Sequence, residues 1–205
     1  MVYSVVIAVL VSYLLGNLNG AVCISALMKD DVRTHGSGNA GLTNFVRNYG
    51  AGRALYVVLI DAGKAYLACL CSGLLLKPYG FYLEGVMVGG MAVMLGHDFP
   101  ALLGFRGGKG ILSGLFIALA ADWRIALLIL AVFAVAYFAT GYVSLGSVLG
   151  CVFFAVGFVI WHHDNLLVML LGILMGALAL FMHRENIVRL LKGQERKTNL
   201  FAKKK

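Results

Sequence analysis

Long apolar runs that are almost free of charge constrain this chain more than any other feature. Crossing a bilayer takes about 17–25 mostly apolar residues, and five runs meet that length: Val2–Leu27, Ala54–Leu76, Ile125–Val143, Leu145–Trp161 and Leu166–Met182. Only 13% of the 205 residues are charged, against about 25% in an average soluble domain. A soluble domain of this size could not bury so much apolar surface. The sequence therefore predicts an integral membrane protein.

Two further apolar runs, Phe81–Gly96 and Gly110–Ala121, are shorter. They either complete a bundle of seven spans or form a broken or re-entrant pair beside five, because non-helical backbone is tolerated in a membrane only where protein covers it. We predict seven. Strand-like alternation is nowhere sustained, so we expect an all-α fold. Residues 1–205 would form a single membrane-embedded domain in which 198–205 are a basic tail.

The basic residues predict the orientation, because cytoplasmic loops of membrane proteins are enriched in Lys and Arg. With seven spans, one side receives fourteen of the 17 basic residues, namely Lys29, Arg33, Arg47, Arg53, Arg106, Lys109 and the eight from Arg184 onward. The other side receives Lys77 and Arg124. We therefore expect the N-terminus outside and the C-terminus in the cytoplasm, where the tail would contact anionic lipid headgroups.

The richest polar segment is residues 33–47, RTHGSGNAGLTNFVR. Its glycines match G-x-G-x-x-G, and Asp61 follows 20 residues after the last of them. A dinucleotide site needs a strand before these glycines and a βαβ unit around them. Here a membrane helix precedes them, so we reject that interpretation.

The same segment still suits an anion. Glycines let backbone N–H groups converge on a negative charge, and the helix N-terminus that follows adds its partial positive charge. Arg47 lies one helical turn beyond Thr43 and Asn44, so all three could face one ligand. The residues that we expect at this site are Gly36, Ser37, Gly38, Asn39, Gly41, Thr43, Asn44 and Arg47.

A second loop, residues 96–110, ends in three glycines around Lys109, which are Gly107, Gly108 and Gly110. It is not a Walker loop, because Leu103 stands where that motif requires glycine. Glycines and a lysine at the start of a helix nevertheless favour an anion. For this loop alone, the alternative interpretation is a glycine turn whose lysine lies on the cytoplasmic side without binding a ligand.

Three smaller groups complete the pattern. Residues 142–147 include Ser144 between two spans, and residues 183–190 leave the last span with His183 and Asn186 on one helical face, followed by Glu195. Within the bilayer, Asp61 and Lys64 lie one turn apart and could neutralise each other, although buried charges in membranes are usually functional. All the loop groups fall on one side of the predicted topology. This indicates one composite site for a ligand with more than one phosphate or for two phosphorylated ligands.

Taken in order, these segments resemble the bacterial acyl-phosphate:glycerol-3-phosphate acyltransferase family, PlsY. The resemblance covers essentially the whole chain. It rests on G-S-G-N-x-G-x-T-N-x-x-R at 36–47, D-x-x-K at 61–64, G-H-x-F-P at 96–100, G-G-K-G at 107–110, V-S-L-x-S at 143–147 and H-R-x-N-I-x-R-L at 183–190. Two positions depart from the family, Asn17 and Ala65, where serine and glycine are common.

The resemblance implies a seven-helix enzyme of the bacterial cytoplasmic (inner) membrane. It would transfer a fatty acyl group from acyl phosphate to the 1-hydroxyl of glycerol 3-phosphate, giving lysophosphatidic acid and phosphate. Acyl phosphate, glycerol 3-phosphate and membrane lipids are the expected partners. No cofactor, metal or nucleic acid is expected. His162, His163 and Asp164 fall on the outer side and are interpreted as loop.

Acyl phosphate is already activated, so the reaction needs positioning and charge stabilisation rather than a covalent intermediate. The chain accordingly has no G-x-S-x-G elbow and no H-x-x-x-x-D pair. The expected catalytic residues are Ser37, Arg47, Lys109, His183 and Asn186. The other expected substrate-binding residues are Gly36, Gly38, Asn39, Gly41, Thr43, Asn44, Lys64, Gly107, Gly108, Gly110, Ser144 and Glu195. The general base stays open between His183 and the donor phosphate.

An anion or phosphate-ester transporter is the alternative. Transporters usually place their site near the midplane between inverted repeats, with polar access from both sides. The outer loops here are short and poor in polar residues, and no internal repeat is visible. The sequence therefore favours the enzyme.

Overall fold

The structure is a computed structural model that describes residues 1–198. The basic tail predicted over 198–205 lies, apart from Thr198, outside the described residues. The α-helices of the described part are α1 (Val2–Gly16), α2 (Gly20–Leu27), α3 (Leu42–Tyr49), α4 (Ala51–Leu76), α5 (Tyr82–Asp98), α6 (Ile111–Ala121), α7 (Trp123–Thr140), α8 (Val143–Trp161), α9 (Leu166–Met182) and α10 (Arg184–Leu191). Short 3-10 helices η1 (Val32–Thr34), η2 (Lys77–Tyr79) and η3 (Ala101–Leu103) lie between them.

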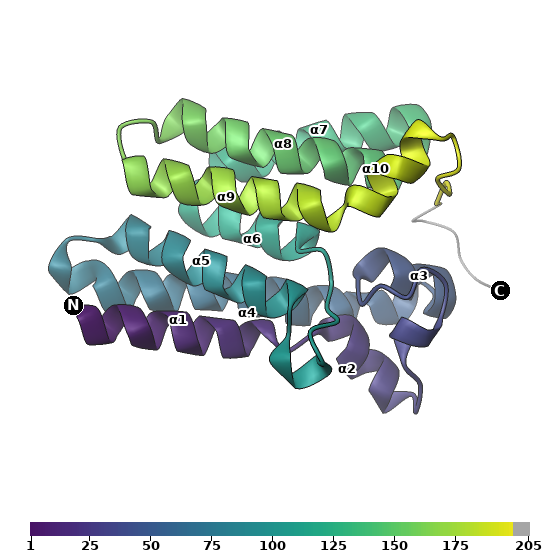
Figure 1. Ribbon diagram of the computed structural model, residues 1–205, viewed down its shortest axis with the longest axis horizontal. Coiled ribbons are helices and arrows are strands. Elements are labelled where there is room, and N and C mark those ends of the chain that lie inside the picture. Colours follow the sequence, from purple (N-terminus) through teal and green to yellow (C-terminus); the bar gives the residue numbers. More distant parts are fainter. Residues whose placement is uncertain (199–205) are drawn as a thin grey trace.

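The long helices run side by side in one bundle (Figure 1). Helices α1, α4 and α5 form one group and α7, α8 and α9 another, with α6 between them in contact with α4, α5, α7 and α8. The N-terminus and the α8–α9 loop lie at one end, and α3 and α10 lie at the other. The polar loops of the predicted site are therefore gathered at one end of an apolar bundle.

The predicted spans agree with the helices in most places. Within residues 1–198, four helices are long and apolar enough to cross a membrane, α4, α5, α7 and α8. Two bent pairs, α1 with α2 and α9 with α10, raise that number to six if each pair counts as one span. The short run at Phe81–Gly96 is part of a full-length helix, whereas α6 has 11 residues, about 16 Å at ~1.5 Å per residue.

The first predicted span, Val2–Leu27, is not one straight helix. It breaks between Gly16 and Gly20, and its two parts meet at 42°. The sequence N-L-N-G at the break explains the new helix, because Asn19 caps α2 by accepting a hydrogen bond from the backbone N–H of Val22 at 3.0 Å. The carbonyls freed at Gly16 and Leu18 accept hydrogen bonds from the buried ammonium of Lys64.

Two glycines bring α1 and α5 into backbone contact at the end of the bundle near the site. A Cβ on Gly96 would lie 2.2 Å from the carbonyl oxygen of Tyr13, and a Cβ on Gly16 would lie 2.7 Å from the Cα of Gly96. Small residues at such crossings let membrane helices approach closely. The position of α1 against α5 thus depends on these two glycines.

We expect Gly96→Ala to lower the stability of the protein by about 1–3 kcal/mol, because the added methyl group forces two backbones apart. A thermal unfolding midpoint in detergent measures the effect. Gly63→Ala in α4 is the matched control: no heavy atom lies within 4 Å of its added Cβ, and alanine favours a helix interior by up to about 1 kcal/mol. A Gly96→Ala midpoint equal to that of Gly63→Ala would contradict the close packing.

Candidate active site

The loop before α3 is organised by Asn44, which is 3% exposed. Its side-chain oxygen accepts from the backbone N–H of Ser37 at 3.1 Å. Its amide nitrogen lies within 3.1 Å of three backbone carbonyl oxygens, those of Val32, His35 and Asn39. These contacts show that Asn44 holds the loop in shape, and its role in substrate binding stays a prediction.

The glycines of this loop are needed for its backbone. Gly36 and Gly38 have φ angles of 60° and 69°, in the left-handed region that favours glycine. A Cβ on Gly36 would also lie 2.4 Å from the side-chain oxygen of Asn44. Ser37 between them is exposed, and Gly41 directly precedes α3 as its N-cap. The predicted order of glycine loop, then helix N-terminus, is therefore present.

The loop before α6 packs against the end of α5. The backbone N–H of Gly108 donates to the carbonyl oxygen of His97 at 3.0 Å. A Cβ would lie 2.0 Å from that oxygen if placed on Gly107, and 2.1 Å from Nε2 of His97 if placed on Gly108. Gly110, with φ of 68°, caps α6. The N–H of Gly108 is thus already used inside the protein, and the role of this loop in binding a phosphate stays a prediction.

Lys109 is directed at the C-terminal part of the chain. Its ammonium donates to the side-chain oxygen of Asn186 in α10. The amide of Asn186 donates to Glu195 at 3.4 Å, and Arg189 donates to the same carboxylate at 2.9 Å. Burial lowers the pKa of Lys109, and the nearby Arg189 lowers it further. The structure thus brings together three predicted residues from two distant segments, Lys109, Asn186 and Glu195.

Arg47 projects from α3 onto the last described residues. Its guanidinium donates to the hydroxyl of Thr198 and to the carbonyl oxygen of Arg196. Thr198 is held in turn by Gly141, to whose carbonyl its N–H donates at 3.2 Å, and by the hydroxyl of Tyr137 at 3.1 Å. Burial lowers the pKa of Arg47, while Glu195 acts in the opposite direction. Sequence reasoning missed Thr198, since a lone threonine near a basic tail carries no pattern.

Glu195 carries a negative charge that acts on both cations, Arg47 and Lys109. It is 9% exposed. Its carboxylate accepts hydrogen bonds from Asn186 and Arg189, and its role in substrate binding stays a prediction. The charged groups that act on Lys109 are two carboxylates and two arginines, namely Glu185, Glu195, Arg184 and Arg189. Counted with Arg47 and Lys109, the cations exceed the carboxylates in charge, which leaves this end of the bundle attractive to an anion.

His183 lies at the joint between α9 and α10 and is 4% exposed. The helix axis turns by 58° there, so the predicted helical face of His183 and Asn186 starts at the bend, where His183 is the N-cap of α10. Nδ1 of His183 lies 2.8 Å from the carbonyl oxygen of Ala179. Because a carbonyl only accepts, Nδ1 carries the hydrogen and Nε2 of the neutral ring is a proton acceptor.

Two other predicted residues are buried. Ser144 lies in the first turn of α8 with a hydroxyl that has no partner among residues 1–198, as expected of a group that waits for a ligand or water. The side chain of Lys64 is 3% exposed, and its ammonium lies within hydrogen-bond distance of Asp61, His97 and two backbone carbonyl oxygens. Its predicted contact with a substrate stays a prediction.

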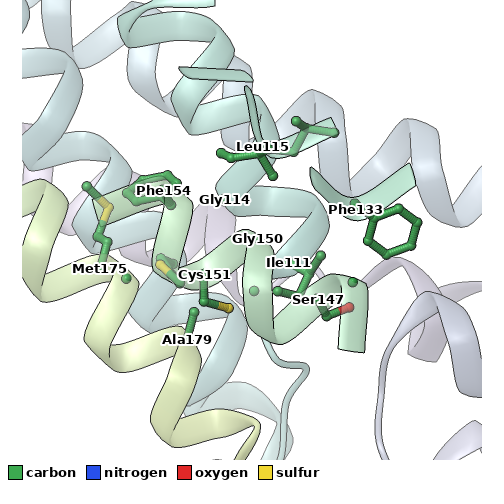
Figure 2. Close-up of a pocket in the computed structure, with 15 residues that line it drawn as sticks. Ile111, Gly114, Leu115, Phe133, Ser147, Gly150, Cys151, Phe154, Met175 and Ala179 are labelled. Carbon is green, nitrogen blue, oxygen red and sulfur yellow. The ribbon is translucent and has the colours of Figure 1, made fainter. Parts of the chain in front are cut away.

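An apolar pocket begins next to the Lys109 loop. Gly110 and Ile111 line it, and it runs between α6, α8 and α9 past Gly114, Gly150 and Met175 (Figure 2). Glycines line part of this pocket, so no side chains fill the space at those positions. The cavity holds about 30 Å³, room for one water molecule. An acyl chain would enter it only after the lining side chains move apart.

Two cations and a glycine loop thus lie at one end of an apolar helical bundle, next to an apolar pocket, and the long apolar helices define the class as an integral membrane protein. Comparison with known proteins gives the family. The family model described as glycerol-3-phosphate acyltransferase matches residues 6–193. A glycerol-3-phosphate acyltransferase of Finegoldia magna is 40% identical over 196 residues, covering 95% of this chain and 96% of the relative. One of Clostridioides difficile is 37% identical over 200 residues, covering 96% of each.

Two solved structures have the same fold. The crystal structure of PlsY, an integral membrane glycerol 3-phosphate acyltransferase, in its glycerol 3-phosphate form has a TM-score of 0.87 and 31% identity, covering 97% of this chain and 100% of that one. Its lysophosphatidic acid form has a TM-score of 0.84 and 30% identity, covering 96% of each. The chain belongs to the glycerol-3-phosphate acyltransferase family and has the all-helical integral membrane fold of PlsY, which confirms the resemblance drawn from its motifs.

Proposed function

We propose that this protein transfers a fatty acyl group from acyl phosphate to the 1-hydroxyl of glycerol 3-phosphate, releasing lysophosphatidic acid and phosphate. The observation that supports this most is the pair of cations, Arg47 and Lys109, each of which contacts the C-terminal part of the chain, Arg47 at Thr198 and Lys109 at Asn186. Two phosphate-bearing substrates need two cationic positions. The solved PlsY forms with glycerol 3-phosphate and lysophosphatidic acid support these ligands as substrate and product.

In the proposed reaction the 1-hydroxyl oxygen forms a bond to the acyl carbonyl carbon, and the bond from that carbon to the phosphate oxygen breaks. The hydroxyl proton ends on the departing phosphate, either directly or through Nε2 of His183. Lys109 and Arg47 would stabilise the charge that grows on the oxygens, which is the larger part of catalysis where no covalent intermediate forms. Ser37, Asn39, Thr43 and Ser144 would orient the substrates.

The apolar pocket beyond Gly110 suits the acyl chain of the donor. Gly110 and Ile111, the two residues after Lys109, line this pocket (Figure 2). If the phosphate of acyl phosphate binds at Lys109, the acyl chain of the same molecule would extend between α6, α8 and α9. Burying apolar carbons there stabilises the complex by about 0.8 kcal/mol per methylene. This would let an amphiphilic donor reach the site from the lipid phase.

The proposed location is the bacterial cytoplasmic membrane, with seven crossings, α6 as the short one, and the site facing the cytoplasm. The excess of basic residues on that side supports the orientation. We expect cysteines introduced at Ser37, Arg106 or Lys192 to react with a membrane-impermeant thiol reagent only from the cytoplasmic face, and one at Lys77 only from outside. Labelling of position 192 from outside intact cells would contradict the orientation.

An anion transporter makes a different prediction in sealed vesicles. Purified protein reconstituted with acyl phosphate and radiolabelled glycerol 3-phosphate should move label into the lipid fraction, without accumulation of free glycerol 3-phosphate in the lumen. Acyl-phosphate-independent accumulation in the lumen, with no label in lipid, would favour the transporter instead. A vesicle preparation that lacks the protein gives the background.

A further inference from the structure

A buried polar cluster lies in the interior of the bundle, close to the Lys109 loop but separate from the cations of the site. Its members are Asp61 and Lys64 in α4 and His97 in α5, all of them at most 5% exposed. The ammonium of Lys64 lies 2.9 Å from Oδ1 of Asp61 and 2.9 Å from Nδ1 of His97. The ion pair predicted from the sequence is therefore present, and a histidine that the prediction did not include completes it.

The contacts of Lys64 determine the protonation of His97. An ammonium has three donors and no acceptor, so Nδ1 of His97 must accept its hydrogen bond. The hydrogen of the neutral ring then sits on Nε2. Asp61 keeps Lys64 charged in this apolar surrounding, and its carboxylate also accepts the N–H of Gly20 at 3.0 Å. Nδ1 is 3.7 Å from Asp61, too far to donate to it.

The opposite edge of the imidazole reaches the Lys109 loop. The carbonyl oxygen of His97 accepts the N–H of Gly108 at 3.0 Å. A Cβ on Gly108 would lie only 2.1 Å from Nε2. Because residue 108 is glycine, no side chain at this position covers the Nε2–H group. A defined hydrogen-bond donor thus stands against the backbone directly before Lys109.

We propose that Asp61, Lys64 and His97 form a positioning relay. Lys64 fixes His97 in its Nε2–H form, and His97 holds the glycine loop and donates that N–H to the phosphate bound beside Lys109. The inference rests on the proposed function for the identity of the phosphate, which belongs to acyl phosphate or to glycerol 3-phosphate. It gives a role to an intramembrane charge pair that touches no substrate itself.

Two variants of His97 separate a donor from a packing group. His97→Gln can place an amide N–H near the position of Nε2, whereas His97→Phe keeps the ring shape and removes the donor. We expect KM for one phosphate substrate to rise about tenfold or more in His97→Phe, the scale of a hydrogen bond to a charged group, and less in His97→Gln. The affinity for inorganic phosphate, measured by phosphorus NMR titration, should weaken in the same order. Equal losses, or a larger loss in His97→Gln, would overturn the proposal.

A neutral double variant, Asp61→Asn with Lys64→Met, tests the relay itself. It removes both charges together, because deleting one alone leaves an unpaired buried charge that destabilises the fold. Nitrogen NMR should find His97 as the single Nε2–H form in the wild type and as a mixture of both forms in the double variant. An Nδ1–H form in the wild type, or an unchanged ring in the variant, would overturn the assignment.

The matched control removes a different buried polar contact of α4, one that it makes with α1. Ser12 of α1 and Ser72 of α4 are hydrogen-bonded at 3.1 Å, and Ser12→Ala should change neither KM nor the state of His97. The NMR and phosphate titrations need no turnover. If the wild type failed to transfer acyl groups, the proposed function would fall while these two measurements still decided the relay.

Discussion

Lys109→Ala is expected to slow acyl transfer at low substrate by about a hundred- to a thousandfold, the effect of losing one preorganised charged contact, about 2.7–4 kcal/mol. The ammonium of Lys109 contacts the side chain of Asn186 and lies near two further charged residues of the C-terminal part, Arg189 and Glu195. Lys109 lies in the loop before α6 and not within a helix of the bundle, so the variant should fold. Steady-state rates of phosphate release with the purified protein measure the loss.

Two companion variants separate charge from geometry. Lys109→Arg keeps the charge but presents a planar fork in a loop whose glycines pack against His97, so it should restore only part of the rate. Arg124 is the control cation, since it pairs with Asp122 far along α7 from the site, and Arg124→Ala should lose much less. If a folded Lys109→Ala protein transferred acyl groups at nearly the wild-type rate, the phosphate-binding role of Lys109 would be contradicted. Lys109 would then be only one of the basic residues that mark the cytoplasmic side.

Acyl-coenzyme A should support turnover at about a thousandth of the acyl-phosphate rate or less. A thioester has no phosphate on its reacting carbonyl, so contacts worth about 4 kcal/mol in the transition state are lost, and each 1.36 kcal/mol is a factor of ten. The chain also lacks the H-x-x-x-x-D pair that would activate the hydroxyl for such a donor. Parallel assays with the same acyl chain on both donors measure the ratio. Equal rates would contradict the proposed chemistry.

Much of the fold could be predicted because long apolar segments have few alternatives to a helix in a membrane. The end of α9 at Met182 is correct to the residue, and α4 begins three residues before the predicted Ala54. The break in the first span was missed because counting apolar residues averages over Asn17 and Asn19. Those two asparagines and the glycines beside them were a local signal, and the structure shows that Lys64 satisfies the carbonyls that the break exposes.

The sequence was enough to predict which types of residue lie at the candidate site, but not what each side chain does there. Glycines, cations and amides were identified, but a spacing rule cannot tell a side chain that faces a ligand from one that holds a loop. Asn44, Glu195 and Lys64 show the difficulty, because the structure has their polar atoms in contacts inside the protein that no spacing indicates. His97 and Thr198 could not be found from spacing, since their partners lie far away in the sequence, Lys64 and Arg47 respectively.

The most direct test of the account is the stoichiometry of the reaction. Purified protein in lipid vesicles, given acyl phosphate and glycerol 3-phosphate, should release one phosphate for each lysophosphatidic acid formed, with the acyl group on the 1-hydroxyl. Omitting glycerol 3-phosphate should stop both. Phosphate release without lysophosphatidic acid, or no turnover by a protein that is folded and binds inorganic phosphate, would contradict the assignment of this site to acyl transfer.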